Sequence, residues 1–144
     1  MQNRVVGTWK MVSAYANPKK DNIAILGSNP NGLLIFTKDF YFSVVVNNPD
    51  TPLFVSGDRF NGTADENKLA VINSLGLFGT YTVDSNGDFF DQQILGSTFP
   101  NWNGVQRGRK EITETVEGDN MIEHLKVSED LLVEIVWQRI KIDA

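Results

Sequence analysis

The sequence predicts an all-β fold, a single antiparallel β-barrel of about eight strands with one short helix. Short runs rich in β-branched and aromatic residues recur along the 144-residue chain, separated by turn residues. Asn86-Gly87 lies between two such runs and is a strong signal for a two-residue hairpin. Trp9 stands near the N-terminus, where chain ends usually contribute little to a core, so we expect it to plug or cap part of the structure.

Eight runs have the length and composition of strands, and tight turns join several of them into hairpins. The expected strands span residues 8–15, 33–37, 40–47, 77–83, 89–95, 105–116, 121–127 and 131–140. The turns are expected at Lys38-Asp39, Asn86-Gly87, Gly118-Asp119 and Ser128-Glu129. No linker or repeat divides the chain, so residues 1–144 are expected to form one barrel domain.

One segment, TADENKLAVINSLG, has a helical pattern instead. Thr63 is followed three residues later by Glu66, which is a capping box. Leu69, Ile72 and Leu75 then recur at helical spacing, and Gly76 is a plausible C-cap. The pattern predicts one helix whose apolar stripe lies on the β structure. The preceding residues 48–61 are expected to form a loop.

Hairpin geometry assigns the faces of the strands, because side chains alternate along a strand. A two-residue loop at Asn86-Gly87 pairs Tyr81 with Gln92 and puts Phe90 on the same face. The hairpins after it pair His124 with Thr113 and with Val133. The expected inward residues are Trp9, Met11, Ser13, Tyr15, Tyr81, Phe90, Gln92, Ile94, Arg109, Glu111, Thr113, Ile122, His124, Val133, Ile135, Trp137 and Arg139. Glu114, Glu123, Glu134 and Gln138 are expected to face solvent. This mixed aromatic and polar interior is typical of a ligand cavity.

Composition excludes several classes of protein. A formal net charge of −5 disfavours a nucleic-acid partner. The chain has no cysteine and one histidine, so we expect neither a metal site nor any cofactor. No apolar run approaches the roughly 20 residues that cross a bilayer, so no membrane insertion is expected. The N-terminus lacks the apolar core of a signal peptide, which predicts a cytoplasmic protein. The oligomeric state, monomer or homodimer, stays open.

Gly7-Thr8-Trp9, together with Arg139 in the last strand, resembles the pattern of the lipocalins and related calycins. The chain is more closely similar to the lipocalin-like domain family of small bacterial and fungal proteins. The similar stretches are VGTWKMVSA, LGSNPNGLLIFTKD, NNPDTPLFVSGDR, LFGTYTVD, LGSTFPNWNG and LVEIVWQR. The chain departs from the family at Gln92-Gln93, where a His-His pair is frequent, and at Asp39-Phe40, where Asp-Gly is usual.

The resemblance implies a calycin-like barrel with an internal pocket. It also implies that Trp9 plugs the closed end and that Arg139 packs over its ring as a cation–π pair. It does not imply an activity, because barrels of this type serve as carriers and also as cyclases or isomerases.

His124 and Tyr81 are the candidate catalytic residues. Histidine titrates near neutrality, so His124 in a dry pocket could act as a general acid or base. The alternative is a core histidine that is satisfied by Thr113 or by a backbone carbonyl. Tyr81 and Gln92 face each other across two strands, where they could orient a ligand oxygen or bond each other.

The candidate ligand-binding residues are Gln92, Trp102, Arg109, Tyr15, Ser13, Phe90, Ile122 and Trp137. An inward Arg109 could bind a ligand carboxylate or enolate, whereas a strand end that emerges into solvent would leave it on the surface. Phe99-Pro100-Asn101-Trp102 could form a rigid lid or could only cover the barrel end.

The expected function is binding of a small, mostly apolar molecule inside the barrel. Two functional classes compete. The protein is either a cofactor-free cyclase or isomerase of specialised metabolism, or a non-catalytic carrier. An interaction module with a filled interior is disfavoured by the mixed lining.

Overall fold

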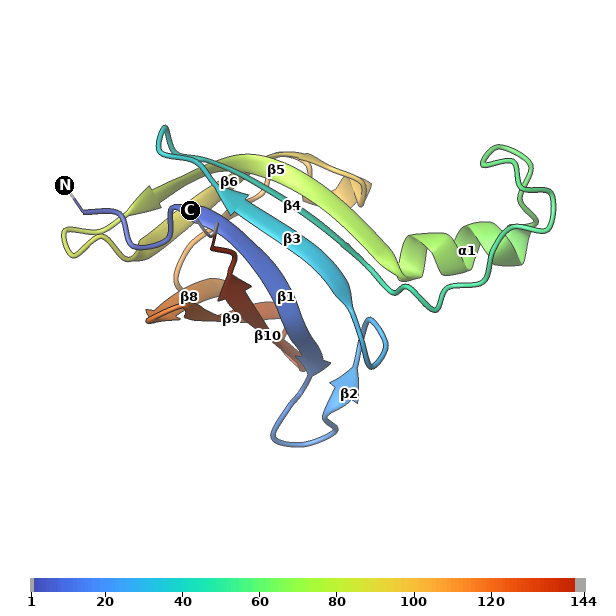
Figure 1. Ribbon diagram of the computed structural model, residues 1–144, viewed down its shortest axis with the longest axis horizontal. Coiled ribbons are helices and arrows are strands. Elements are labelled where there is room, and N and C mark those ends of the chain that lie inside the picture. The colour runs from blue at the N-terminus through green and yellow to red at the C-terminus, as the bar shows by residue number, and fades with distance from the viewer. Residues whose placement is uncertain (1, 142–144) are drawn as a thin grey trace.

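The computed structural model describes residues 2–141, whose strands form one curved antiparallel sheet (Figure 1). The strands are β1 (Gly7–Ala16), β2 (Ile23–Ala24), β3 (Asn31–Phe36), β4 (Tyr41–Asn47), β5 (Ser74–Val83), β6 (Phe89–Ser97), β7 (Gln106–Arg107), β8 (Ile112–Glu117), β9 (Asn120–Ser128) and β10 (Leu131–Arg139). The helical segments are α1 (Ala64–Ile72) and the short 3₁₀ helix η1 (Pro100–Trp102).

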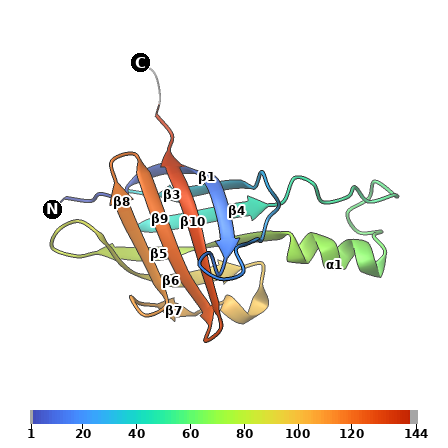
Figure 2. The same cartoon turned by 90° about the horizontal axis from the view of Figure 1, so that it is seen from below.

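The sheet curls into a nearly closed barrel, as the sequence predicts. Its strand order is β7-β6-β5-β4-β3-β1-β10-β9-β8, and the short β2 pairs with β1 outside this path. β1, the first strand, pairs with β10, the last, from Trp9 opposite Arg139 to Ala16 opposite Val133. Figure 2 shows β8, β9 and β10 crossing in front of β3 to β6, with the core enclosed between them.

Side chains bridge the seam where the two ends of the sheet meet without a hydrogen-bonded ladder. Arg4 forms an ion pair with Asp88 in the β5–β6 hairpin, with 2.7 Å between Nη1 and Oδ1. The same guanidinium donates to the Val116 carbonyl of β8 at 3.2 Å. Arg109, in the turn before β8, pairs with Asp84 at 2.8 Å. The barrel is therefore closed here by cations rather than by backbone pairing.

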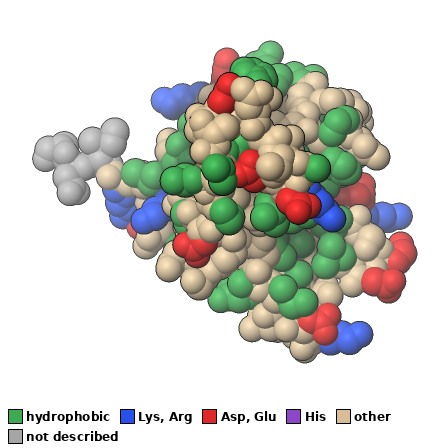
Figure 3. All heavy atoms as spheres, turned by 90° about the vertical axis from the view of Figure 1, so that its right-hand side faces the viewer, with side chains coloured by type: hydrophobic (Ala, Val, Ile, Leu, Met, Phe, Trp, Pro, Cys, Tyr) green, Lys and Arg blue, Asp and Glu red, His purple; other side chains and the backbone are tan. Residues whose placement is uncertain are grey.

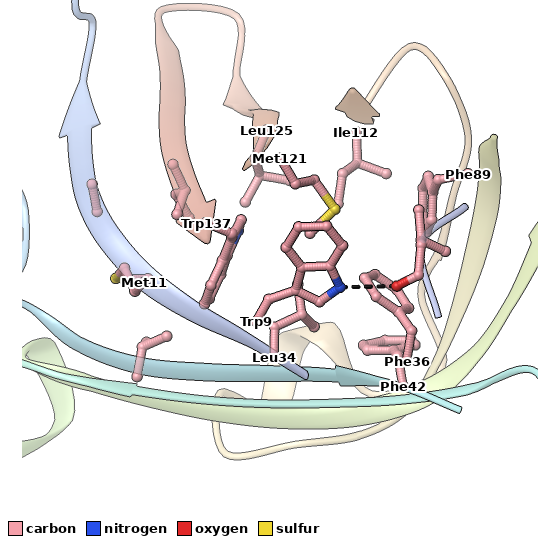
Figure 4. Packing of buried hydrophobic residues seen from close by; sticks show 14 of the residues in the cluster. Trp9, Met11, Leu34, Phe36, Phe42, Phe89, Ile112, Met121, Leu125 and Trp137 are labelled. Atoms are coloured by element: carbon pink, nitrogen blue, oxygen red, sulfur yellow. Dashed lines mark hydrogen bonds between the residues drawn. The ribbon is translucent and has the colours of Figure 1, made fainter. Parts of the chain in front are cut away.

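Trp9 closes the end of the barrel opposite α1. Its indole is fully buried, and its Nε1 donates to the Val5 carbonyl at 2.8 Å (Figure 4). The Arg139 guanidinium lies 4.2 Å from the ring centroid and donates to the carbonyls of Val6 and, at 2.9 Å, of Arg4. The indole and guanidinium thus join the first strand to the last, as the resemblance to the lipocalins implies.

An aromatic cluster fills the space beside Trp9. Phe36, Tyr81 and Phe89 lie within 6.4 Å of one another by ring centroids. Phe40 packs on Tyr81 at 5.4 Å and has a φ of 69°, a left-handed backbone that is strained for a bulky residue. This strain explains the glycine that the resemblance leads one to expect at this turn position.

The connection from β4 to β5 projects away from the barrel, and we call residues 48–73 the arm (Figure 1). The capping box at α1 is present: Glu66 N donates to Thr63 Oγ1 at 3.1 Å, and Thr63 N donates to Glu66 Oε1 at 2.9 Å. The expectation that α1 packs its apolar stripe on the sheet is wrong, because no residue of α1 is buried. The helix also ends earlier than expected: its C-cap is Asn73, and both Leu75 and Gly76 belong to β5.

Three strand pairs contain a β-bulge, and each bulge moves the following side chains to the opposite face. In β1 the extra residue is Val12, between Met11 and Ser13. In β6 two residues are extra: Phe90, since Val83 pairs with Phe89 and Thr82 with Asp91, and Leu95, since Phe78 pairs with Gly96 and Gly79 with Ile94. In β9 the extra residue is Val127, because Leu131 pairs with Ser128 but Leu132 pairs with Lys126. The expected strand 105–116 is also divided, into β7 and β8 with a turn between them.

Candidate functional site

A cavity of about 220 Å³ lies inside the barrel, on the α1 side of Met11 and Trp137. We call it the barrel cavity. Half-exposed residues form its rim at the start of β5 and beside β2, and Figure 3 shows the molecule from this side, with apolar and charged side chains intermixed. Its apolar walls are Met11, Ile25, Leu26, Leu34, Phe36, Phe42, Val44, Val46, Ile72, Leu75, Leu77, Trp102, Ile112, Leu125, Val127, Val133, Ile135 and Trp137. Ligand pockets usually measure about 300–1,000 Å³, so a ligand of this cavity is small.

Most of the polar side chains of the barrel cavity gather on one wall. Gln92 comes from β6, Arg107 from β7, Glu114 from β8 and Glu123 from β9, and all four are buried. Each stands at an inward position of its strand, between apolar neighbours that face the core. Burial of charged groups is costly unless partners compensate them, so the contacts of this polar wall decide what it does.

Glu114 and Glu123 occupy directly opposite positions on β8 and β9. Side chains at such positions have Cβ atoms roughly 4.5–5.5 Å apart, and two like charges there repel each other. Glu123 Oε1 accepts a hydrogen bond from Trp137 Nε1 at 3.1 Å. Glu114 Oε2 is buried and has no hydrogen-bond partner. The pair is therefore asymmetric: one carboxyl is held by the indole, and the other has an unpartnered oxygen.

Arg107 supplies a positive charge to the polar wall. Its Nη1 lies 3.4 Å from Gln92 Oε1, and its guanidinium stacks 4.4 Å from the centroid of the Trp102 ring. Burial lowers the pKa of Arg107, while the charges of Glu123 and Glu111 act in the opposite direction. Arginine keeps its proton in proteins, so Arg107 balances one carboxylate of the wall.

The charge state of Glu114 follows from these surroundings. Burial raises the pKa of Glu114 well above its usual range, and the charge of Glu123 and a hydrogen bond with Glu123 raise it further. A raised pKa means that the neutral acid persists to higher pH than in a surface carboxyl. The polar wall thus combines two carboxyl groups, of which Glu114 has the raised pKa, with an arginine and an amide.

Three of the expected ligand-binding residues line the barrel cavity: Gln92, Trp102 and Trp137. Gln92 lies opposite Tyr81, as predicted, although the expected two-residue loop is wrong: three residues separate the paired Asp84 and Asp88, and the bulge at Phe90 restores the register. Trp102 lies in η1 and meets Phe99 edge-on, with 5.2 Å between ring centroids. The loop for which a lid and a simple cover of the barrel end were the two alternatives contributes Trp102 to the cavity wall.

Tyr81 is buried, as expected, but it lies in the aromatic cluster and does not line the barrel cavity. Its hydroxyl donates to the Thr37 carbonyl at 2.6 Å and accepts from Asn3 Nδ2 at 2.9 Å. Burial raises the pKa of Tyr81. With both hydrogen-bonding roles filled by the protein, Tyr81 has a structural place at the closed end.

The expected inward placement of His124 and Ile122 is wrong. The pairing of β8 with β9 is as predicted, with Thr113 opposite His124. The last hairpin differs: its turn is Glu129-Asp130 and not the expected Ser128-Glu129, and Val127 is an extra residue, so β9 is displaced by one residue against β10. His124 consequently lies opposite Glu134 on the outer face, where its Nε2 is 2.9 Å from Glu134 Oε2. About two fifths of the His124 side chain is exposed (42%).

Four further expected ligand contacts lie outside the barrel cavity. Phe90 is the extra residue of the β6 bulge and is exposed, with the Arg109 guanidinium 4.9 Å from its ring centroid. Arg109 sits in the turn before β8 rather than inside a strand, and it pairs with Asp84. Ser13 and Tyr15 follow the bulge at Val12, so Ala14 and Ala16 take the inward positions instead.

The expectation that Glu114 and Glu123 face solvent is wrong, because both are buried, and Arg107 was not among the predicted site residues. A signal for the two glutamates was present in the sequence. The alternative face of β8 and β9 carries Ile112, Val116, Met121 and Leu125 beside the two glutamates. The face that was expected to point inward carries mainly threonines, His124 and Lys126. Counting apolar residues on the two faces would have favoured the observed register despite its buried carboxyls.

The site can therefore bind a small molecule by its apolar walls and can orient it by hydrogen bonds from the polar wall. Among residues 2–141, no three side chains of the metal-ligating types are placed to hold a metal ion together. The described part of the chain also contains no helix with the length and apolar character needed to cross a membrane.

Comparison with known proteins agrees with the fold. The sequence profile of the lipocalin-like domain matches residues 6–140, from just before β1 to just beyond β10. A comparison with curated proteins found no match. The profile match spans nearly the whole barrel, and the chain belongs to the lipocalin-like domain family.

Proposed function

We propose that the protein binds a small, mostly apolar molecule inside the barrel cavity. The observation that carries this proposal is an interior space of about 220 Å³ whose walls are apolar except for one buried polar side. A barrel that served only as a scaffold would gain stability by filling this space with aliphatic side chains. The lipocalin-like fold also suggests small-molecule binding.

The second candidate function is that of a cofactor-free cyclase or isomerase, and the polar wall favours it. Isomerisation requires that one proton is given to the ligand and one is taken back, with no net exchange of electrons. Glu114 as a neutral acid and Glu123 as a carboxylate would supply these two roles within one apolar cavity. A carrier needs neither role. We place such a reaction in natural-product biosynthesis in the cytoplasm, and neighbouring biosynthetic genes would support this assignment.

Binding can be tested with the fluorescent neutral probe N-phenyl-1-naphthylamine, whose emission rises on transfer from water to an apolar site. Val44 lines the barrel cavity, whereas Val45, the next residue of β4, is exposed on the outer face. We expect the wild-type protein and Val45→Trp to bind the probe equally. Val44→Trp should abolish binding, because the added ring occupies the cavity.

The two variants carry the same change at adjacent positions, so a general effect on the fold or on surface binding would appear in both. Equal probe binding by Val44→Trp and wild type would contradict the proposal. Thermal unfolding of both variants should be followed in parallel, so that only folded protein is compared. The catalytic candidate is tested by incubating the protein with a compound that it binds. Catalysis would be seen as conversion of that compound to an isomer of the same mass.

A further inference from the structure

The unpartnered oxygen of Glu114 is the least satisfied polar atom of the barrel cavity. The side chain is more than nine-tenths buried, yet Oε2 has no hydrogen-bond partner within the protein. A buried polar atom without a partner is costly, and native proteins usually supply one. Because Glu114 lines the barrel cavity, a bound molecule can provide the missing partner.

The two carboxyls of the polar wall differ in their partners. Trp137 Nε1 donates to Glu123, and the charge of Arg107 interacts with Glu123. Glu114, directly opposite on β8, has no such donor at Oε2. Burial and the neighbouring charge of Glu123 raise the pKa of Glu114, which favours its neutral, proton-bearing form.

The geometry points to Glu114 as a hydrogen-bond donor that selects a neutral ligand with an acceptor oxygen, such as a ketone, ester or ether. This inference rests on the proposed binding function and adds the chemical class of the ligand. A ligand carboxylate is disfavoured, since it would bring a second negative charge beside Glu123 and would compete for Arg107, which Gln92 and Trp102 already hold in place.

The pH at which Glu114 loses its proton depends on the charged and titratable groups around it. Glu123 and Arg107 are two of them. Four others, Arg4, Asp84, Asp88 and Arg109, line a polar groove along the seam, and Glu114 also lines this groove. The last is Glu111, whose charge acts on Arg107. The groove pairs Arg4 with Asp88 and Arg109 with Asp84, so its charges compensate each other. Burial raises the pKa of Glu114, and the neighbouring charge that raises it further is that of Glu123.

Three naphthalenes of similar size test the inference by displacement of N-phenyl-1-naphthylamine. They are 2-acetylnaphthalene, which carries an acceptor oxygen, 2-ethylnaphthalene, which carries none, and 2-naphthoate, which carries a negative charge. We expect the ketone to bind about tenfold more tightly than the hydrocarbon, the effect of one net hydrogen bond. The anion should bind more weakly than both. The ketone preference should decline as pH rises and Glu114 loses its proton.

Two variants of Glu114 separate donation from shape. Glu114→Gln keeps a donor of the same length, so the ketone preference should persist and become independent of pH. Glu114→Met removes the donor, so the preference should vanish while the hydrocarbon still binds. Glu117→Gln, at an exposed outward position of β8, is the matched control and should behave as wild type.

A wild-type protein that binds ketone and hydrocarbon equally would overturn the inference, and so would a preference that survives Glu114→Met. Failure of the proposed function is a different outcome, because then none of the naphthalenes would displace the probe and Val44→Trp would have no effect. A second measurement does not need a ligand. The folded-state pKa of Glu114 is raised, so its contribution to stability should be complete at low pH and be lost as pH rises through that pKa, and Glu114→Gln should remove this dependence.

Discussion

The Arg139–Trp9 contact gives the sharpest prediction for stability. Replacing Arg139 with Met keeps the length and apolar stem of the side chain but removes the guanidinium. The lost contacts are a cation–π interaction at 4.2 Å, worth about 1 kcal/mol, and hydrogen bonds to two backbone carbonyls. Each bond from a charged donor contributes about 1.5 kcal/mol, and water can replace part of it at a half-buried site. We therefore expect a loss of about 3 kcal/mol.

Equilibrium unfolding in urea, followed by tryptophan fluorescence, measures this loss. In a chain of this length the melting temperature should fall by about 6–12 °C. Gln138→Met is the control, because Gln138 is the exposed neighbour on β10 and should change the free energy of unfolding by less than about 0.5 kcal/mol. If Arg139→Met lost as little as the control, the contact would not hold the first and last strands together, and the argument for barrel closure at this end would fail.

Three other substitutions test separate parts of the structure. Gly79→Ala should prevent folding or cost more than about 3 kcal/mol in thermal unfolding, because its Cβ would lie 1.8 Å from the Gln93 carbonyl oxygen. Thr63→Ala should reduce helical circular dichroism and speed hydrogen exchange in the arm, but the melting temperature of the barrel should not change, because α1 has no buried residue. His124→Gln should leave probe binding unchanged and cost at most about 1 kcal/mol in urea, because its pair with Glu134 is exposed; a loss of probe binding would show that the histidine reaches the cavity.

The fold could be predicted because its signals are local or depend on chain order. The Asn86-Gly87 hairpin, the Thr63–Glu66 capping box and the pairing of Tyr81 with Gln92 each depend on a few neighbouring residues. The alternation of apolar side chains then required a curved sheet with one buried face.

The site was harder to predict. Whether a side chain points into the barrel depends on every residue between it and the residue with which it pairs on the next strand. One extra residue in a bulge moves the side chains that follow it to the opposite face of the sheet. No turn motif in the sequence indicates the bulges at Val12, Phe90 or Val127. Trp137 was placed correctly because β10 alternates regularly, with Val133, Ile135 and Trp137 on its buried apolar face. Glu114 and Glu123 were missed because charged residues are usually exposed. That rule fails where a partner or a functional site keeps a carboxyl buried.

The unpaired Val127 has a consequence for how the interior of this barrel can evolve. The hairpin of β8 and β9 carries two sets of side chains, one with two carboxyls and one with an imidazole, and the bulge determines which set faces inward. Deletion of a single codon there would exchange the two sets, at the cost of turning Met121 and Leu125 toward solvent. Acidic and histidine-based interiors are thus separated by one mutational step on the same scaffold, and sequence divergence among such barrels can alter their chemistry before it alters their shape.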